Sequence, residues 1–367
     1  MTQDAYGFQR PVVNETLCIN CGLCVRVCPT RRDAENTHNA LQAECYAAWV
    51  NDDSLALQTT SGGILTALAL QCIRAGGVVS AVGMNNNRPE RCFAATEKEV
   101  LACASSKYVQ AATPAEHYEQ LSRHLKEGKK VLFVGTPCQV AALNTYMGTN
   151  APNLLTAEFL CHGTPTPLLL DKYRIWRNTE HHGEINDIGF RGKKIQGWMR
   201  SSIDCRFSDG RVVHTRLDFD PYYRFFASLL PMNSACFSCR RASLERVADI
   251  TCMDYWHAPQ TVLKDRAYLG ASLVAVHTEK ASEWLDGMKT VAVFHPVDLP
   301  AYYRCQHAFY TPADRPARWE EFMKRLPADD FETLRQAFLP PLPLRYVIRG
   351  QLKWMLSRIL SLFRHHA

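Results

Sequence analysis

The sequence predicts an α/β protein with a mixed sheet, preceded by a small cysteine-rich unit at the N-terminus. Short apolar strands alternate with helices between residues 61 and 178, a pattern typical of a sheet with helices packed on it. Strand pairs follow, with a hairpin signal at residues 208–210, Ser-Asp-Gly. Four closely spaced cysteines precede all of these elements.

The composition sets broad limits on what the chain does. Its 367 residues, 47% of them hydrophobic and 21% charged, suffice for one large or two medium globular domains. Fifteen cysteines without an apolar signal segment in residues 1–17 argue against a disulfide scaffold. They favour a cytoplasmic protein whose thiols bind metal. The net charge of +6 is not gathered in a basic block in the body of the chain, so we expect no nucleic-acid partner.

The N-terminal cysteines follow the pattern C-x₂-C-x₂-C-x₃-C-P, which is typical of a [4Fe-4S] cluster. They are Cys18, Cys21, Cys24 and Cys28, with Pro29 after the last. Zinc or disulfides fit less well, because zinc motifs usually contain two separated cysteine pairs. The last cysteine of such a run ligates the other cluster in two-cluster ferredoxins, but we assign Cys28 to this cluster. Residues 1–35 are thus predicted to be a ferredoxin-like unit, too short to hold a core without metal.

A small-residue turn, Ser61-Gly62-Gly63, precedes the apolar run from residue 64 to residue 77. The run predicts a helix with Ser61 near its N-cap, followed by a buried strand at residues 78–83. Free amides at such a helix start suit a phosphate or a flavin edge. An ordinary turn and cap explains the same residues.

A polar group, Ser106-Lys107-Tyr108, interrupts an otherwise apolar stretch. A lysine beside a hydroxyl and a tyrosine is suited to an anionic cofactor. A lysine in a solvated loop is the alternative interpretation.

Two strand–loop–helix units follow a predicted helix at residues 118–128. The first strand, residues 129–134, leads to Cys138 at the start of a helix, and the second, residues 154–160, leads to Cys161. Because the carboxyl ends of parallel strands share one edge of a sheet, the two cysteines are candidate ligands of one site. A buried structural cysteine is the alternative for either of them.

A lone C-x₂-C pair, Cys236 and Cys239, has no second pair nearby. It lacks the strand-to-helix start of a thioredoxin-like redox motif, so we interpret it as half of a metal site completed elsewhere in the fold. With Cys138 and Cys161 it gives four thiols, the number that one further cubane cluster requires. The remaining cysteines lack ligand spacing and are interpreted as packing thiols: Cys45, Cys72, Cys92, Cys103, Cys205, Cys252 and Cys305.

The rest of the chain is divided into three parts. Residues 36–260 are predicted to form the catalytic domain, 261–340 a supporting C-terminal subdomain, and 341–367 a basic amphipathic tail. The tail has five basic and no acidic residues from Leu344 onward, which suits a peripheral contact with the inner face of a membrane or a docking partner. It is too charged to span a bilayer, and packing on its own domain is the alternative.

Taken together, these motifs resemble the coenzyme F420 hydrogenase/dehydrogenase beta-subunit family, which includes plant hydroxymethyl-chlorophyll reductase. The resemblance runs from the first cysteine motif to about Trp256. It rests on the following stretches: Ser61-Gly62-Gly63, Ser106-Lys107-Tyr108, Gly135-Thr136-Pro137-Cys138-Gln139, Cys161-His162-Gly163, Cys236-x-x-Cys239 and Asp249-Ile250. The family often shows Gly-Asp-Phe-Trp-Gly where this chain has Met-Asp-Tyr-Trp-His at residues 253–257.

The resemblance implies an iron–sulfur flavoprotein with FAD and two [4Fe-4S] clusters. FAD would lie against Ser61, Gly62, Gly63, Ser106, Lys107 and Tyr108. The second cluster would be held by Cys138, Cys161, Cys236 and Cys239. Lys107 is the candidate for tuning the flavin, because a cation near the ring stabilises the reduced anion. His162 is a candidate proton donor, with a hydrogen bond that supports the neighbouring ligand as the alternative.

The function expected from the sequence is an FAD- and [4Fe-4S]-dependent oxidoreductase. It would pass electrons from a ferredoxin-like one-electron carrier through both clusters to FAD and on to a small-molecule substrate or a deazaflavin. One alternative is an electron-transfer subunit without its own substrate site, serving a partner enzyme. Another is a zinc-stapled structural protein, which would be colourless.

Overall fold

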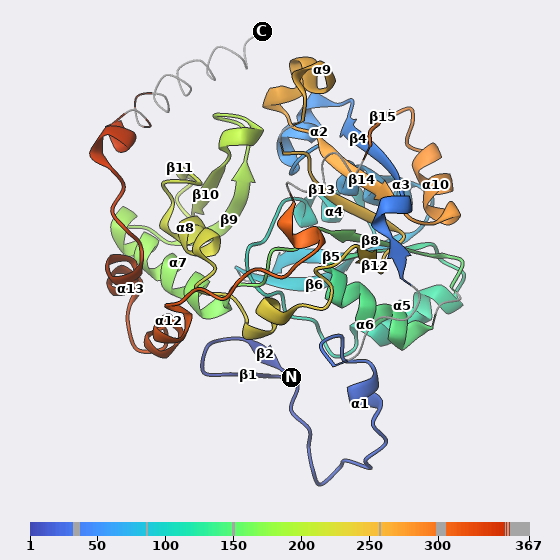
Figure 1. The fold of residues 1–367 in the computed structure, drawn as a ribbon, viewed down its shortest axis with the longest axis horizontal. Coiled ribbons are helices and arrows are strands. Elements are labelled where there is room, and N and C mark those ends of the chain that lie inside the picture. The colour runs from blue at the N-terminus through green and yellow to red at the C-terminus, as the bar shows by residue number, and fades with distance from the viewer. Residues whose placement is uncertain are drawn as a thin grey trace.

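The computed structural model describes residues 1–31, 37–85, 87–148, 151–256, 258–298, 306–348, 350 and 352, with only the backbone described at 264 and 265. Its largest element is an eight-stranded mixed sheet with the order β15-β4-β14-β13-β8-β7-β5-β6 (Figure 1). Four neighbouring strands, β13, β8, β7 and β5, run parallel, and antiparallel strands extend the sheet on both sides. The strands are β4 Glu44–Val50, β5 Val78–Asn85, β6 Arg88–Ala94, β7 Val131–Gly135, β8 Leu154–Phe159, β13 Ile250–Asp254, β14 Ser272–Val276 and β15 Ala292–Pro296.

Helices cover both faces of this sheet, because alternate residues of its parallel strands point to opposite sides. Leu132 of β7 packs in one core with helix α3 and with residues of α2, α4 and α10. Val131 and Phe133 of the same strand pack in the opposite core with α5 and α6. The helices are α2 Asp53–Gln58, α3 Ile64–Arg74, α4 Glu97–Cys103, α5 His117–Lys126, α6 Pro137–Met147 and α10 Glu279–Asp286.

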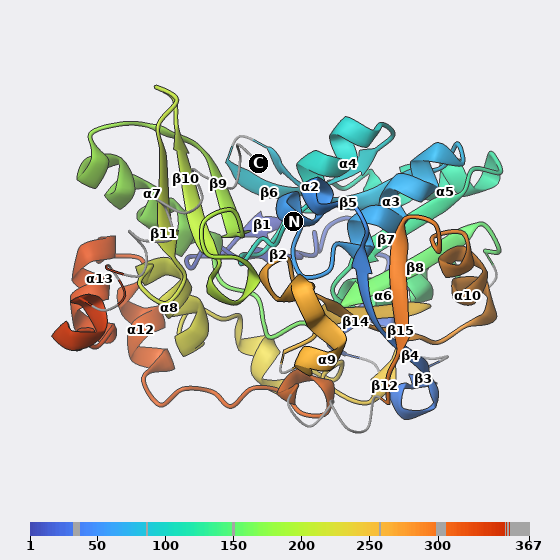
Figure 2. The same ribbon diagram turned by 90° about the horizontal axis from the view of Figure 1, so that it is seen from above.

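A second unit consists of a three-stranded antiparallel sheet with four helices and lies beside the main sheet (Figure 2). Its core is rich in aromatic side chains and also contains Phe8 from the N-terminal segment. Its strands are β9 Ile185–Gly192, β10 Ser202–Phe207 and β11 Val212–Arg216. Its helices are α7 Pro167–His181, α8 Pro221–Ser228, α12 Trp319–Arg325 and α13 Phe331–Phe338.

Short elements connect these two units. Strand β1 (Thr2–Gln3) pairs with β2 (Gln9–Arg10), and the two-residue strands β3 (His38–Asn39) and β12 (Glu245–Arg246) pair with each other. The single-turn helices are α1 Leu23–Arg26, η1 Ala40–Gln42, η2 Trp198–Arg200, η3 Ser234–Ser238, α9 Gln260–Leu263, η4 Lys264–Tyr268 and η6 His307–Phe309.

The mixed α/β architecture predicted from the sequence is confirmed, as are the strand–helix alternation and the hairpin of β10 and β11. The limit predicted at residue 260 falls inside the main sheet, because β13 on one side of it pairs in register with β14 on the other. Helices α12 and α13 belong instead to the core of the second unit.

Most of the predicted basic tail lies outside the described residues, including Arg349 and residues 353–367. Leu344, Ile348 and Leu352 are described and exposed. Within the described part of the chain, no helix is both long and apolar enough to cross a bilayer.

Candidate functional site

The four distant cysteines lie on loops at one end of the main sheet. Cys138 is the second residue of α6, directly after β7, and Cys161 lies two residues beyond the end of β8. Strands β7 and β8 are parallel neighbours, so their carboxyl ends bring the two residues to the same edge. A capping box at Thr136 starts α6 and fixes the turn that carries Cys138, whose Sγ lies 3.1 Å from Thr136 Oγ1.

The other two cysteines reach this edge through η3, which carries Cys236 and ends at Cys239. The loop after Cys161 holds η3 in place, since the Asn233 amide donates to Thr164 O at 2.9 Å. The fit is close at Gly163, where an added Cβ would lie 3.6 Å from Cys236 Cβ. Gly163 also has a φ of +121°, a conformation that favours glycine.

Cys161 and Cys236 are both influenced by the other cysteines of this set. Burial raises the pKa of Cys161, and the neighbouring Cys138, Cys236 and Cys239 raise it further. Burial likewise raises the pKa of Cys236 to about 11, with further contributions from Cys138 and Cys239. Thiols so desolvated stay protonated unless a metal displaces the proton, so the donor set fits an iron–sulfur cluster bound by four thiolates. Among the described residues, the side chains of His, Cys, Asp and Glu form no group suited to a single metal ion.

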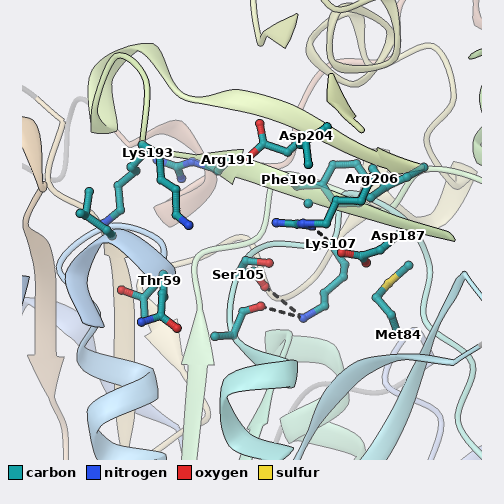
Figure 3. Close-up of a pocket in the computed structure, with 18 of the residues that line it drawn as sticks. Thr59, Met84, Ser105, Lys107, Asp187, Phe190, Arg191, Lys193, Asp204 and Arg206 are labelled. Carbon is teal, nitrogen blue, oxygen red and sulfur yellow. Dashed lines mark hydrogen bonds and ion pairs between the residues drawn. The ribbon is translucent and has the colours of Figure 1, made fainter. Parts of the chain in front are cut away.

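A cavity of about 510 Å³ lies between the two units, within the size range of small-molecule sites. One wall comes from the end of α2 and the α4 region, and the other from β9, β10 and β11. Figure 3 shows Lys107 and Arg206 on opposite sides of it. Its ionisable lining residues are mostly basic: Lys107, Arg191, Lys193, Lys194, Arg206 and His214, against Asp187 and Asp204. This excess of positive charge suits an anionic ligand.

A β-bulge places Arg191 at this cavity. Ser202 pairs with Gly192 and Ile203 with Phe190, so Arg191 is the extra residue of β9 and has a φ of +64°. Its guanidinium pairs with Asp254 at the end of β13 and lies over the ring of Trp256. The ion pair therefore ties the second unit to the main sheet.

Asp254 accepts hydrogen bonds from several donors, Arg191 and Trp198 among them. Burial would raise the pKa of this carboxyl, but Arg191 and hydrogen bonds from Trp198 and Ser61 hold it below its usual value. The indole of Trp198 donates at 2.9 Å and also stacks on Trp256. Asp254 belongs to the stretch in which this chain departs from the family pattern, and the neighbouring Met253 is buried while residue 257 is outside the described residues.

Lys107, predicted as a flavin residue, lines the cavity. Its Nζ donates to the carbonyls of Cys103 (2.6 Å), Ala104 (3.2 Å) and Ser105 (3.3 Å) at the end of α4. Burial lowers the pKa of this amine to about 8. The ammonium is thus held in place by the helix C-terminus, and its charge is sensitive to pH near neutrality.

The backbone amides of Gly62 and Gly63 in the Ser61-Gly62-Gly63 turn are hydrogen-bonded within the protein. Gly62 N donates to Ser272 Oγ at 3.0 Å and Gly63 N to Thr60 O at 3.1 Å, so the expectation of outward-facing free amides is wrong for these two groups. Ser61 is not the cap of α3, since Gly63 occupies the N-cap with a φ of +79° and no side-chain bond. The turn also packs tightly against β4, since a Cβ at Gly62 would lie 2.1 Å from Ala48 O.

The turn still adjoins the cavity through Lys193. This buried lysine lines the cavity and donates to the carbonyls of Ser61 (2.8 Å) and Leu269 (2.7 Å). Burial lowers its pKa to about 7. Thr59, two residues before Ser61, also lines the cavity.

Ser106 and Tyr108, the neighbours of Lys107, are not among the described residues that line this cavity. Ser106 forms a β-bridge with Phe190 of β9, and the Tyr108 ring packs against Phe190, Tyr223 and Phe226. Burial raises the pKa of the Tyr108 hydroxyl. Both residues thus hold the Lys107 segment against the second unit.

His162 follows Cys161 directly and is exposed to solvent. The protein around the imidazole lowers its pKa, while the charge of Asp254 opposes this shift. Arg191 of the cavity pairs with the same Asp254, so this carboxylate interacts with residues on both sides, His162 beside Cys161 and Arg191 in the cavity wall.

The N-terminal cysteines lie on a loop that projects from the body of the protein (Figure 1). Cys18, Cys21 and Cys24 are exposed, and Gly22 starts α1 with a φ of +71° and nothing within 4 Å of its Cβ position. Glycine is therefore required here by the backbone conformation. Burial would raise the pKa of Cys28, but hydrogen bonds from Thr30 and Arg31 lower it.

Sequence reasoning missed Arg191, Lys193, Asp204 and His214. His214 Nδ1 lies 2.8 Å from Asp204 Oδ1, and the Ser202 hydroxyl donates to the same carboxylate. A Cβ at Gly192 would lie 2.1 Å from Asp204 Oδ2, so glycine is needed beside this carboxylate. The basic run Arg-Gly-Lys-Lys at residues 191–194 was the one signal available in the sequence.

Most of the chain matches known protein families. Residues 45–116 match the family described as coenzyme F420 hydrogenase/dehydrogenase, beta subunit N-term, and residues 128–299 match its C terminus. The chain belongs to the coenzyme F420 hydrogenase/dehydrogenase beta-subunit family. Residues 11–31 match a 4Fe-4S binding domain. Together these matches indicate an oxidoreductase that uses iron–sulfur electron transfer.

Among solved structures, a chain of the F420-reducing [NiFe] hydrogenase complex from Methanosarcina barkeri is similar, with 15% identity and a TM-score of 0.46. The match covers 83% of this chain and 94% of that one. No curated protein sequence matches the chain.

Proposed function

We propose that this protein is an FAD-dependent oxidoreductase with two [4Fe-4S] clusters, which passes electrons between a one-electron protein carrier and a small molecule or deazaflavin. Cys18, Cys21, Cys24 and Cys28 would hold the outer cluster, and Cys138, Cys161, Cys236 and Cys239 the inner one. When bound, the clusters supply single-electron transfer and FAD supplies two-electron chemistry.

The observation that carries this proposal is a link between one inner cysteine and the cavity through Asp254. Asp254 acts on His162, next to Cys161, and pairs with Arg191 in the cavity wall. A cofactor in the cavity would therefore be connected to the inner thiols through Arg191, Asp254 and His162. Electrons would pass between the two bound groups across this link.

The cavity residues fit an anionic dinucleotide. Lys107 and Lys193 provide amines that are fixed by carbonyl oxygens, and Arg191 provides a guanidinium fixed by Asp254. These groups would bind a pyrophosphate or stabilise a negative charge on a reduced ring. Phe190 and Met84 add apolar surface to the lining.

Proton supply would come from residues near the carboxylates. His214 is held by Asp204 in the cavity wall, which orients the imidazole as a proton donor or acceptor. His162 is the second candidate, since it is open to solvent beside Asp254.

The outer loop would be the docking point of the carrier. Leu17 and Ile19 on this loop are exposed, and Leu23 and Val25 of α1 are exposed beside them. An exposed thiolate motif with an apolar rim is suited to brief contact with a small redox protein.

Reduction of bound FAD by a photoreduced ferredoxin, followed in a stopped-flow instrument, tests the proposal. We expect fast reduction in the wild-type protein and at least about tenfold slower reduction in Cys21→Ser, because the outer entry point is lost. A wild-type protein that binds no flavin after anaerobic reconstitution would instead be an electron-transfer subunit, and the proposal would fail.

A further inference from the structure

Two cysteines outside both proposed cluster sites lie next to each other. Cys92 of β6 and Cys103 at the end of α4 have their Sγ atoms 3.6 Å apart. Both residues are partly exposed, whereas the other thiols interpreted as packing residues that the structure describes, Cys45, Cys72, Cys205 and Cys252, are buried. Cys305 lies outside the described residues.

Glycine makes this approach possible. Gly83 of β5 lies beside both sulfurs, and a Cβ at this position would be 3.3 Å from Cys92 Sγ and 3.5 Å from Cys103 Sγ. A larger side chain would wedge between the thiols and the strand. The pocket around the two sulfurs is therefore shaped for two thiols and little else.

The two sulfurs differ in their electrostatic environment. The hydrogen bond between the two thiols, the Gly83 amide and the charges of Lys107 and Arg91 all lower the pKa of Cys92. The same hydrogen bond raises the pKa of Cys103, together with burial and the nearby Glu99. The Gly83 amide and the charge of Arg91 act on Cys92, so we assign Cys92 as the attacking thiolate, which leaves Cys103 as the resolving thiol.

The pair adjoins the cavity. Lys107, which lines the cavity, donates to Cys103 O and lies in the electric field of both sulfurs. Ala102 and Ala104, on either side of Cys103, line the cavity as well.

We propose that Cys92 and Cys103 form a redox-active pair that interconverts between dithiol and disulfide next to the cavity. Rotation of the side chains brings sulfurs in contact to bonding distance without moving the strand or the helix far. The disulfide fastens the end of α4 to β6 and removes a negative charge beside Lys107.

A small disulfide RSSR, such as oxidised glutathione, serves as the oxidant. The Cys92 thiolate attacks one sulfur and releases RS⁻, forming a mixed disulfide. Cys103 gives up its proton and attacks Cys92 Sγ, which forms the Cys92–Cys103 bond and releases a second RS⁻. Two electrons pass from the pair to RSSR, and the released proton converts one RS⁻ to RSH.

The experiment equilibrates the full-length holoprotein anaerobically in glutathione buffers of increasing oxidised fraction. Acid quenching, alkylation and peptide mapping then measure each cysteine. We expect a Cys92–Cys103 linked peptide that rises with the oxidised fraction and disappears with dithiothreitol. Full alkylation of both residues at every ratio, or linkage only after unfolding, would overturn the proposal.

Variants test the assigned roles. Cys103→Ser should retain a stable glutathione adduct at Cys92, whereas Cys92→Ser should show roughly tenfold less adduct at Cys103. Cys72→Ser, which removes a buried thiol, is the matched control and should leave the linked peptide unchanged. Equal adduct formation at the two positions would contradict the roles, and the wild-type mapping stands if a variant does not fold.

Discussion

The outer and inner cysteine sets differ in what holds them. The outer set lies on a segment, residues 17–28, where Ile19 is 84% and Leu17 77% exposed and α1 has no buried residue. The inner set is carried by the ends of β7 and β8, which pack on a formed core, and by η3, which is hydrogen-bonded to the loop after Cys161. We therefore expect metal to organise the outer site, and the fold to hold the inner cysteines in place without metal.

The largest expected effect separates the two sites by their iron. Cys138→Ser should reduce the iron content by about four atoms per chain, since it removes one ligand of a cubane. Iron and sulfide analysis after anaerobic reconstitution measures this. The thermal unfolding of the protein should change little, because the inner loops do not depend on metal for their position.

If Cys138→Ser leaves the iron content unchanged, the inner cysteines are packing thiols. Cys252→Ser is the matched control, because Cys252 is a buried cysteine on β13 of the same sheet and is not among the proposed cluster ligands.

Cys21→Ser should also remove about four irons, but with a different structural effect. We expect residues 11–31 to become sensitive to limited proteolysis while the two cores stay folded, because this segment contributes no buried side chain from Cys18 to Cys28. Mass spectrometry of the early cleavage products checks this. Equal protection of the loop in the wild-type and variant proteins would contradict the contrast between the sites.

The sequence predicts those features of the two cysteine sets that depend on residues close together in the chain. The outer motif is contiguous, and the parallel strands before Cys138 and Cys161 place those residues at one edge by a general rule. Arg191 was missed because a bulge, which has no sequence signature here, turns it toward Asp254. The free amides expected at the Ser61 turn are absent at Gly62, because its amide donates to Ser272, a residue 210 positions away in sequence.

The link between the inner site and the cavity can be broken at Arg191. Arg191→Met leaves Asp254 without its buried partner, which should lower the free energy of unfolding by about 3 kcal/mol. Urea denaturation measures the change. Arg206→Met removes a more exposed pair with Asp187 on the same sheet and should cost less than about 1 kcal/mol. Equal effects of the two variants would remove Arg191 from its linking role.

A smaller effect is expected at Lys107. Lys107→Ala should weaken FAD binding about tenfold, which is about 1.4 kcal/mol, because it removes a positive charge that is held in the cavity wall by three backbone carbonyls. Fluorescence titration of the flavin-free protein measures the affinity, with the exposed Lys98 of α4 replaced by Ala as control. Unchanged affinity would remove Lys107 from the site.

The pH dependence of FAD binding distinguishes the contribution of Lys107 from that of Lys193. Burial lowers the pKa of Lys107 to about 8 and of Lys193 to about 7, so both amines lose their charge as the pH rises through this range. Affinity for the anionic ligand should therefore fall between about pH 6 and pH 9. In Lys107→Ala the upper part of this decline should vanish, and an unaltered profile would assign the decline to other groups.

The central claim, that one chain carries two clusters and a flavin, is tested most directly by counting cofactors. Iron, acid-labile sulfide and flavin are quantified per chain after anaerobic reconstitution of the wild-type protein. The account requires about eight iron, about eight sulfide and one FAD. About four iron with no flavin would contradict it.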